Sequence, residues 1–96
     1  FSLEDSLHID TYFMSASGID PVIGCTDLGF SEASVQNQMR HAARRTVVYA
    51  DSSKFGRASL VRVCPIEEVD CIITDRGLSE EQKNAFMERG ANLIIV

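Results

Sequence analysis

The residues best placed to do chemistry are Asp51, Ser52, Ser53 and Lys54, which directly follow an apolar run over residues 46–50. That run is rich in β-branched and aromatic residues and predicts a buried strand. A carboxylate, two hydroxyls and an ammonium would then lie at the carboxyl edge of a sheet, where open α/β sheets bind ligands. The alternative is a solvated turn in which Asp51 and Ser52 hydrogen-bond to nearby backbone amides. The spacing alone does not decide between the two.

Polar residues also follow two other predicted strands. Ser17 comes just after the strand expected over residues 10–16, and Asp75 comes after the strand expected over residues 71–74. In a parallel sheet, the carboxyl ends of all three strands meet at the edge that carries Lys54. We therefore expect one cluster of polar side chains along that edge.

The segment that follows the first strand adds more polar groups near the same edge. They are Asp20, Thr26 and Asp27, followed by Ser31 and Glu32 at the start of a helix. Carboxylates accept hydrogen bonds from sugar hydroxyls, whereas an ammonium and backbone amides bind phosphate. The mixture suits a small polyol that carries an anionic group.

Several of these residues also have a plain structural explanation. Asp75 fits a turn former, Asp20 fits an Asx turn before a proline, and Glu32 fits a residue that interacts with the helix dipole. Lys54 is harder to explain in this way, because a lone cation between two serines and an aromatic residue has little local structural use.

Other site classes find no support in the sequence. His8 and His41 have no partner at the spacing of metal ligands, so no metal site is expected. No Ser-His-Asp or Cys-His arrangement, P-loop or GxGxxG motif is present. The net charge is −5, and the nine Lys and Arg residues form no basic face, so this chain by itself is not expected to bind nucleic acid.

The three cysteines, Cys25, Cys64 and Cys71, form no CxxC pair and lie in or beside apolar sequence. This pattern predicts free thiols in a reducing compartment, with a disulfide or a metal site as the weaker alternative. No apolar run is long enough to span a membrane and no signal-peptide pattern is present, so a cytoplasmic protein is expected. Because the first residue is Phe1 rather than Met, we expect a fragment of a longer protein.

Apolar strands alternate with amphipathic helices, which predicts an α/β fold with a mostly parallel sheet flanked by helices. Residues 17–30 contain two glycines and a proline and are expected to form one long irregular loop. The expected strands cover residues 10–16, 46–50, 60–64, 71–74 and 92–96, and residues 1–8 have helix-compatible spacing.

Two helices are expected. In the first, Ser31 is the expected N-cap, and the residues expected on the apolar face are Ala33, Val35, Met39, Ala42 and Ala43. In the second, Ser79 and Gln82 form a capping box and Gly90 ends the helix.

Four segments together resemble the sensor domain of DeoR-type bacterial transcriptional repressors. They are residues 15–20, 24–33, 49–57 and 72–75, which contain the sequences SASGID, GCTDLGFSEA, YADSSKFGR and IITD. The resemblance covers nearly the whole chain. It implies a fold similar to ribose-5-phosphate isomerase and glucosamine-6-phosphate deaminase, used to sense a phosphorylated sugar or polyol that relieves repression.

The resemblance also implies an organisation and a ligand set. Residues 1–96 would be part of the C-terminal sensor domain, with the start of that domain and the amino-terminal winged helix-turn-helix absent. DNA would be bound only through the missing domain, and no cofactor would be needed. Because missing sheet neighbours would leave apolar surface exposed, a homo-oligomer is also expected. The expected ligand-binding residues are Ser17, Gly18, Asp20, Thr26, Glu32, Asp51 and Lys54.

The related isomerases carry a motif like Asp-Gly-Ala-Asp where this chain has Ser17-Gly18-Ile19-Asp20, and a lysine where residues 24–32 have none. Isomerisation needs a positioned base and an electrophile. We therefore expect a site that holds a phosphosugar without transforming it. The alternatives are an isomerase or deaminase that uses Asp20 or Glu32 as base, and a structural or dimerisation fragment without a ligand.

Overall fold

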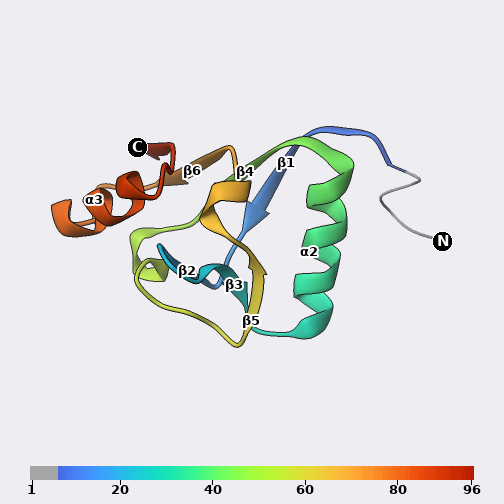
Figure 1. Ribbon diagram of the computed structural model, residues 1–96, viewed down its shortest axis with the longest axis horizontal. Helices are drawn as coiled ribbons and strands as arrows, with labels where there is room; N and C mark the ends of the chain where they lie inside the picture. The colour runs from blue at the N-terminus through green and yellow to red at the C-terminus, as the bar shows by residue number, and fades with distance from the viewer. Residues whose placement is uncertain (1–6) are drawn as a thin grey trace.

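The main sheet consists of four parallel strands. The computed structural model describes residues 7–96, and Figure 1 shows how its sheets and helices are arranged. In spatial order the main sheet contains β1 (Ile9–Ser15), β4 (Ala43–Tyr49), β6 (Cys71–Thr74) and β7 (Leu93–Ile95). The prediction of an α/β fold with a mostly parallel sheet is confirmed.

The segment expected to be one irregular loop forms part of a second, small sheet. It contains β2 (Gly18–Asp20) and β3 (Gly24–Asp27), which pair antiparallel, and β3 in turn pairs with β5 (Val61–Cys64). The loop prediction was wrong because strands of three and four residues are too short to show a periodicity. Their pairing with β5 depends on residues distant in the sequence.

Helix α2 (Phe30–Ala42) differs from its prediction at both ends and on its apolar face. Ala43, expected on that face, is the first residue of β4. The N-cap of the helix is Gly29, and Ser31 lies inside the helix. The expected apolar face is also wrong at Val35, whose side chain is 51% exposed. Only Ala33 is fully buried, and the side of α2 that contacts the rest of the molecule carries polar residues such as Arg40, whose side chain is only 11% exposed.

Helix α3 (Glu80–Glu88) begins and ends as predicted. Ser79 accepts a hydrogen bond from the Gln82 amide at 3.1 Å, and the full capping box is present. At the other end Gly90 has a φ of +81°, and the amide of Ala91 donates to Phe86 O at 3.1 Å, which completes a Schellman motif. Two short 3-10 helices, η1 (Ser52–Lys54) and η2 (Ile66–Glu68), lie between strands.

The core lies on one face of the main sheet. Each successive crossover moves in the same direction across the sheet, so right-handed connections place α2, the small sheet and α3 on the same face. Met14, Val48 and Ile72 of three neighbouring strands form one cluster there with Phe86 of α3. Figure 1 shows α2 and α3 at opposite ends of the molecule, with the small sheet between them.

The opposite face of the main sheet carries exposed apolar side chains. Phe13, Tyr49 and Ile94 are exposed by 60%, 49% and 43%, respectively. Parallel sheets are ordinarily covered on both faces, so this surface is open in the part of the chain that the structure describes.

None of the helices in the described part of the chain is long and apolar enough to cross a bilayer. Most of the helix-compatible segment 1–8 lies outside the described residues.

Candidate functional site

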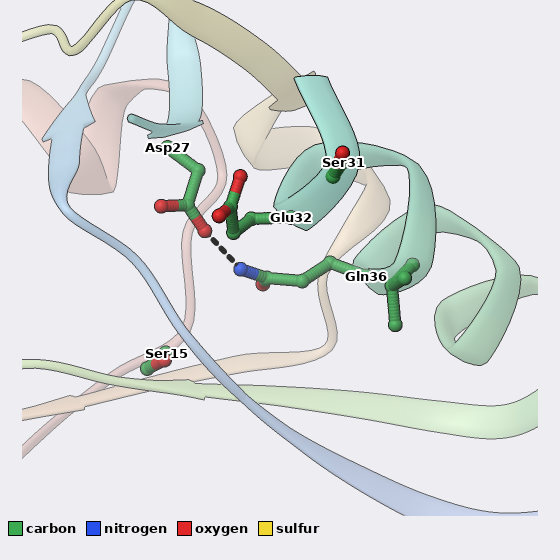
Figure 2. Close-up of a pocket in the computed structure, with 6 residues that line it drawn as sticks. Ser15, Asp27, Ser31, Glu32 and Gln36 are labelled. Carbon is green, nitrogen blue, oxygen red and sulfur yellow. Dashed lines mark hydrogen bonds between the residues drawn. The ribbon is translucent and has the colours of Figure 1, made fainter. Parts of the chain in front are cut away.

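A pocket of about 460 Å³ lies where the ends of β1 and β3 meet the first turns of α2. Its volume lies within the range of small-molecule sites. Figure 2 shows its side chains, which come from three different elements and include two carboxylates. The lining residues are Ser15, Asp27, Ser31, Glu32, Val35 and Gln36.

Asp27 organises the floor of this pocket. Its side chain is buried, and its Oδ1 accepts hydrogen bonds from the Ser17 hydroxyl at 3.0 Å and from the Leu28 amide at 2.8 Å. Its Oδ2 accepts a hydrogen bond from Gln36 Nε2 (Figure 2). The Gln36 Oε1 atom is buried and accepts no hydrogen bond from any residue between 7 and 96. A buried acceptor without a donor is suited to a ligand hydroxyl.

Glu32 provides the second carboxylate of the pocket. It lies in the first turn of α2, where the helix dipole favours a negative charge. Its side chain folds back over Gly29, because a Cβ atom on that glycine would lie 2.3 Å from Glu32 Oε2. Within residues 7–96 the Glu32 carboxylate makes no hydrogen bond or ion pair, so both of its oxygens can accept hydrogen bonds from a ligand.

The loop after β4 is held by two aspartates. Asp51 accepts hydrogen bonds from the hydroxyl and the amide of Ser53, and these bonds lower the pKa of its carboxyl group. Asp75 accepts hydrogen bonds from the amides of Ser52 at 3.0 Å and Gly77 at 2.7 Å, which lower its pKa in the same way. Both carboxylates therefore act as turn formers, which is the structural role that the sequence also allowed for them.

Lys54 is the cation of the same loop. Its side chain is half-buried, and its ammonium makes no hydrogen bond or ion pair with any residue that the structure describes. The negative charge nearest to it in sequence is Asp51, whose Oδ1 accepts two hydrogen bonds from Ser53. An ammonium without a partner in a partly buried position is suited to an anion.

The pocket and the Lys54 loop lie along the same edge of the main sheet. Ser15, the last residue of β1, lines the pocket and lies opposite Tyr49, the last residue of β4. Lys54 follows Tyr49 by five residues in the sequence. Neighbouring strands are about 4.8 Å apart. The small sheet links the two regions, since the Gly56 amide donates to Ile19 O at 2.8 Å. The expectation that the strand ends share one edge is confirmed.

Three of the expected ligand-binding residues have structural roles in the β2–β3 hairpin. Asp20 Oδ2 accepts from the amides of Val22 and Ile23, both at 2.8 Å, and so forms the Asx turn considered above. The buried Thr26 hydroxyl donates to Gly18 O at 2.9 Å and accepts from the Ser59 amide at 2.8 Å.

Gly18 is a glycine because the backbone approaches closely at that position. A Cβ atom there would lie 2.6 Å from Arg57 O and 2.8 Å from the Thr26 hydroxyl. The position is buried, so Gly18 shapes the hairpin.

The sequence reasoning did not place Asp27 or Gln36 among the ligand-binding residues. A signal was present, because Gln36 follows Glu32 by four residues and therefore lies on the same side of the helix. The hydrogen bond between Gln36 and Asp27 depends on the small sheet, which no local pattern indicated.

A second cavity of about 470 Å³ lies at the opposite edge of the main sheet. It is lined by Asp10, Thr11, Arg44 and Arg45, at the amino ends of β1 and β4. Its arginines could also attract an anion, but ligands of open α/β sheets bind at the carboxyl edge. In the described part of the chain, no group of three or more His, Cys, Asp or Glu side chains is arranged to hold a metal ion.

Comparison with known proteins identifies one matching family model. Residues 2–76 match the model of the DeoR C-terminal sensor domain. The matched segment contains the pocket, the small sheet and the Lys54 loop.

Similar full-length proteins are named as transcriptional regulators. The HTH-type transcriptional regulator IolR of Bacillus subtilis is 31% identical over 77 residues, which are 80% of this chain and 31% of the relative. The HTH-type transcriptional regulator GlpR of Haloferax volcanii is 29% identical over 93 residues, 97% of this chain and 36% of the relative. The L-fucose operon activator of Haemophilus influenzae is 32% identical over 74 residues, which are 77% of this chain and 30% of the relative. The chain thus spans about a third of the length of these relatives.

Proposed function

The chain belongs to the family of DeoR C-terminal sensor domains, and from this premise we propose that it binds a phosphorylated sugar or polyol. Lys54 binds the phosphate of this effector. Glu32, with Asp27 and Gln36, binds its hydroxyl groups. Membership of a sensor family, with relatives named as transcriptional regulators, assigns the chain to regulators rather than to enzymes.

The observation that carries this proposal is the pair of unpartnered charges on one edge of the sheet. Neither the Lys54 ammonium nor the Glu32 carboxylate makes a hydrogen bond or an ion pair within residues 7–96. A ligand that is anionic at one end and rich in hydroxyls at the other satisfies both groups. A neutral sugar would leave Lys54 without an anion, and inorganic phosphate would leave Glu32 and Gln36 without donors.

The remaining expected ligand-binding residues support this site from the hairpin and the loop. Ser17 holds Asp27 by its hydroxyl, while Gly18, Asp20 and Thr26 fix the conformation of the β2–β3 hairpin. Asp51 fixes η1 and so positions Lys54.

The whole protein would control transcription in the cytoplasm. In this proposal residues 1–96 are part of the C-terminal sensor domain, and a separate winged helix-turn-helix binds DNA. One relative is named an L-fucose operon activator, which connects the family with sugar-dependent genes in at least that case. A homo-oligomer is expected, as for regulators that bind paired DNA half-sites.

Effector binding would act by shifting a population between two states. The effector must bind the state released from DNA more tightly than the DNA-bound state. The β2–β3 hairpin is the element expected to change, because it borders the pocket through Asp27 and contacts the Lys54 loop through Ile19.

Thermal unfolding in the presence of a panel of sugars tests the proposal. Each phosphorylated sugar or polyol is compared with its unphosphorylated form and with inorganic phosphate. At about 100 times its Kd, an effector should stabilise the native state by about 2.7 kcal/mol. The proposal requires that only phosphorylated members shift the transition. If none of them does, the chain is a structural or dimerisation module and the proposal fails.

A further inference from the structure

Two of the three cysteines face each other inside the small sheet. Cys25 on β3 and Cys64 on β5 are Cα partners beside a register shift between Cys25 and Thr26, and their exposed fractions are 0% and 2%. Residues directly opposite each other in antiparallel strands have Cα atoms about 4.5–5.5 Å apart. That separation lies within the range of about 4.4–6.8 Å found in disulfides. A bond between the two sulfur atoms therefore requires little movement of the backbone.

The surroundings make one of the two thiols the better nucleophile. The Cys25 thiol hydrogen-bonds to the Cys64 sulfur, which lowers the pKa of Cys64 and raises that of Cys25. The guanidinium of Arg40 on α2 and that of Arg62 on β5 also lower the pKa of Cys64, whereas burial and the carboxylate of Glu68 on η2 raise it. Thiolates react with oxidants and thiols do not, so Cys64 is the sulfur that reacts first.

Both cysteines are free thiols in the structure. We propose that Cys64 and Cys25 form a redox pair, which a small peroxide converts into a disulfide that joins β5 to β3. The Cys64 thiolate attacks one peroxide oxygen, the O–O bond breaks, and a sulfenic acid and hydroxide form. The Cys25 sulfur then attacks the sulfur of the sulfenic acid and displaces its oxygen as water. Overall, two thiols give up two electrons and two protons, and one hydrogen peroxide becomes two waters.

The disulfide would act on the site described above, and this part of the inference rests on the proposed function. Thr26 and Asp27 follow Cys25 directly, and Asp27 forms the floor of the pocket. A covalent bond between β3 and β5 holds the β2–β3 hairpin in its present position. The oxidised protein therefore cannot make the hairpin rearrangement that effector binding requires.

Peptide mapping by mass spectrometry after treatment with hydrogen peroxide tests bond formation. In the unmodified protein we expect a peptide pair linked through Cys25 and Cys64, lighter by two hydrogens and separated by a reducing agent. The matched control is Cys71→Ser, which removes a third buried thiol outside the pair and should leave the linked peptides unchanged. Cys64→Ser should abolish them. Thiols that stay free, a bond to Cys71, or oxidation to sulfinic acid would each overturn the proposal, and the map of the unmodified protein suffices even if a variant misfolds.

Hydrogen exchange of the β2–β3 hairpin tests the consequence separately. Effector should change exchange of amides in residues 18–27 in the reduced protein and leave it unchanged in the oxidised protein. An equal change in both forms overturns the coupling to the pocket while the disulfide stands. If no phosphosugar binds the reduced protein, the proposed function fails, and the peptide map still decides whether the redox pair exists.

Discussion

Asp75, which follows β6, accepts a hydrogen bond of 3.0 Å from the backbone amide of Ser52, which follows β4. The bond joins the carboxyl ends of two neighbouring strands. It orients the first residue of η1, whose last residue is Lys54. The position of Lys54, which is proposed to bind phosphate, therefore depends on the carboxylate of Asp75. Asp75 itself is not proposed to contact the effector.

The acid stability of this loop should follow from the same bond. The amides of Ser52 and Gly77 lower the pKa of Asp75 in the folded state. The folded state thus binds the proton less readily than the unfolded chain, whose Asp has a pKa of about 3.9. The resulting stabilisation is present above that pH and is lost as the pH falls through the lower folded-state pKa. Carbon-13 NMR titration should show Asp75 titrating below the ordinary range, and Asp75→Asn should remove this part of the acid dependence. Titration at or above the ordinary value would contradict the bond.

Replacing Lys54 should separate binding from folding. Lys54→Ala removes the only group proposed to bind phosphate and leaves no buried polar atom without a partner. We expect it to lose most of the effector-induced rise in melting temperature while the melting temperature without effector stays nearly unchanged. Lys83→Ala is the matched control, because Lys83 only pairs with Glu80 on α3. A full effector response in Lys54→Ala would show that another group binds the phosphate.

The two carboxylates of the pocket should behave differently when each is removed. Asp27→Ala leaves the Ser17 hydroxyl, the Leu28 amide and the Gln36 amide without their acceptor, and should lower the free energy of unfolding by about 1–3 kcal/mol. Glu32→Ala removes an exposed side chain without hydrogen bonds within residues 7–96, so stability should change little while effector affinity falls. Urea denaturation and effector titration of both variants measure this contrast. Similar losses of stability in the two variants would contradict the assigned roles.

Gly24 should be far less replaceable than Gly90, although both have a positive φ. In an L-residue that conformation alone costs about 1–2 kcal/mol. A Cβ atom at Gly24 would also lie 2.2 Å from Cys64 O, whereas at Gly90 no atom lies within 4 Å. Gly90→Ala should therefore cost about 1–2 kcal/mol, and Gly24→Ala clearly more, with chemical denaturation as the measurement. Equal costs would mean that β3 and β5 are not packed as closely as described.

The main sheet was predictable because its signals are local. The apolar run that ends just before Asp51 and the capping box of Ser79 each lie within a few residues. The first forms a strand and the second begins a helix, as expected. The common edge followed from the rule that parallel strands point the same way. The likeness to known sensor domains also lay in short segments around Asp20 and Lys54.

The small sheet and the inner face of α2 were not predictable from local patterns. β2 and β3 are held by β5, which lies more than thirty residues further along the chain. The polar residues Gln36 and Arg40 contact the rest of the molecule because Asp27 and Glu68 are there to bind them. The contacts with Asp27 and Glu68, rather than the apolar periodicity, thus determine which side of α2 faces the rest of the molecule. The pocket could not be assigned without knowing these contacts.

The central claim is that one effector binds across the pocket and the Lys54 loop at the carboxyl edge of the main sheet. Titration of the isotope-labelled protein with a phosphorylated sugar selected by the thermal panel tests it most directly. The backbone amide signals of Ser17, Glu32 and Lys54 should shift together, with a single dissociation constant. Shifts centred instead on Arg44 and Arg45, at the opposite edge, would contradict the account.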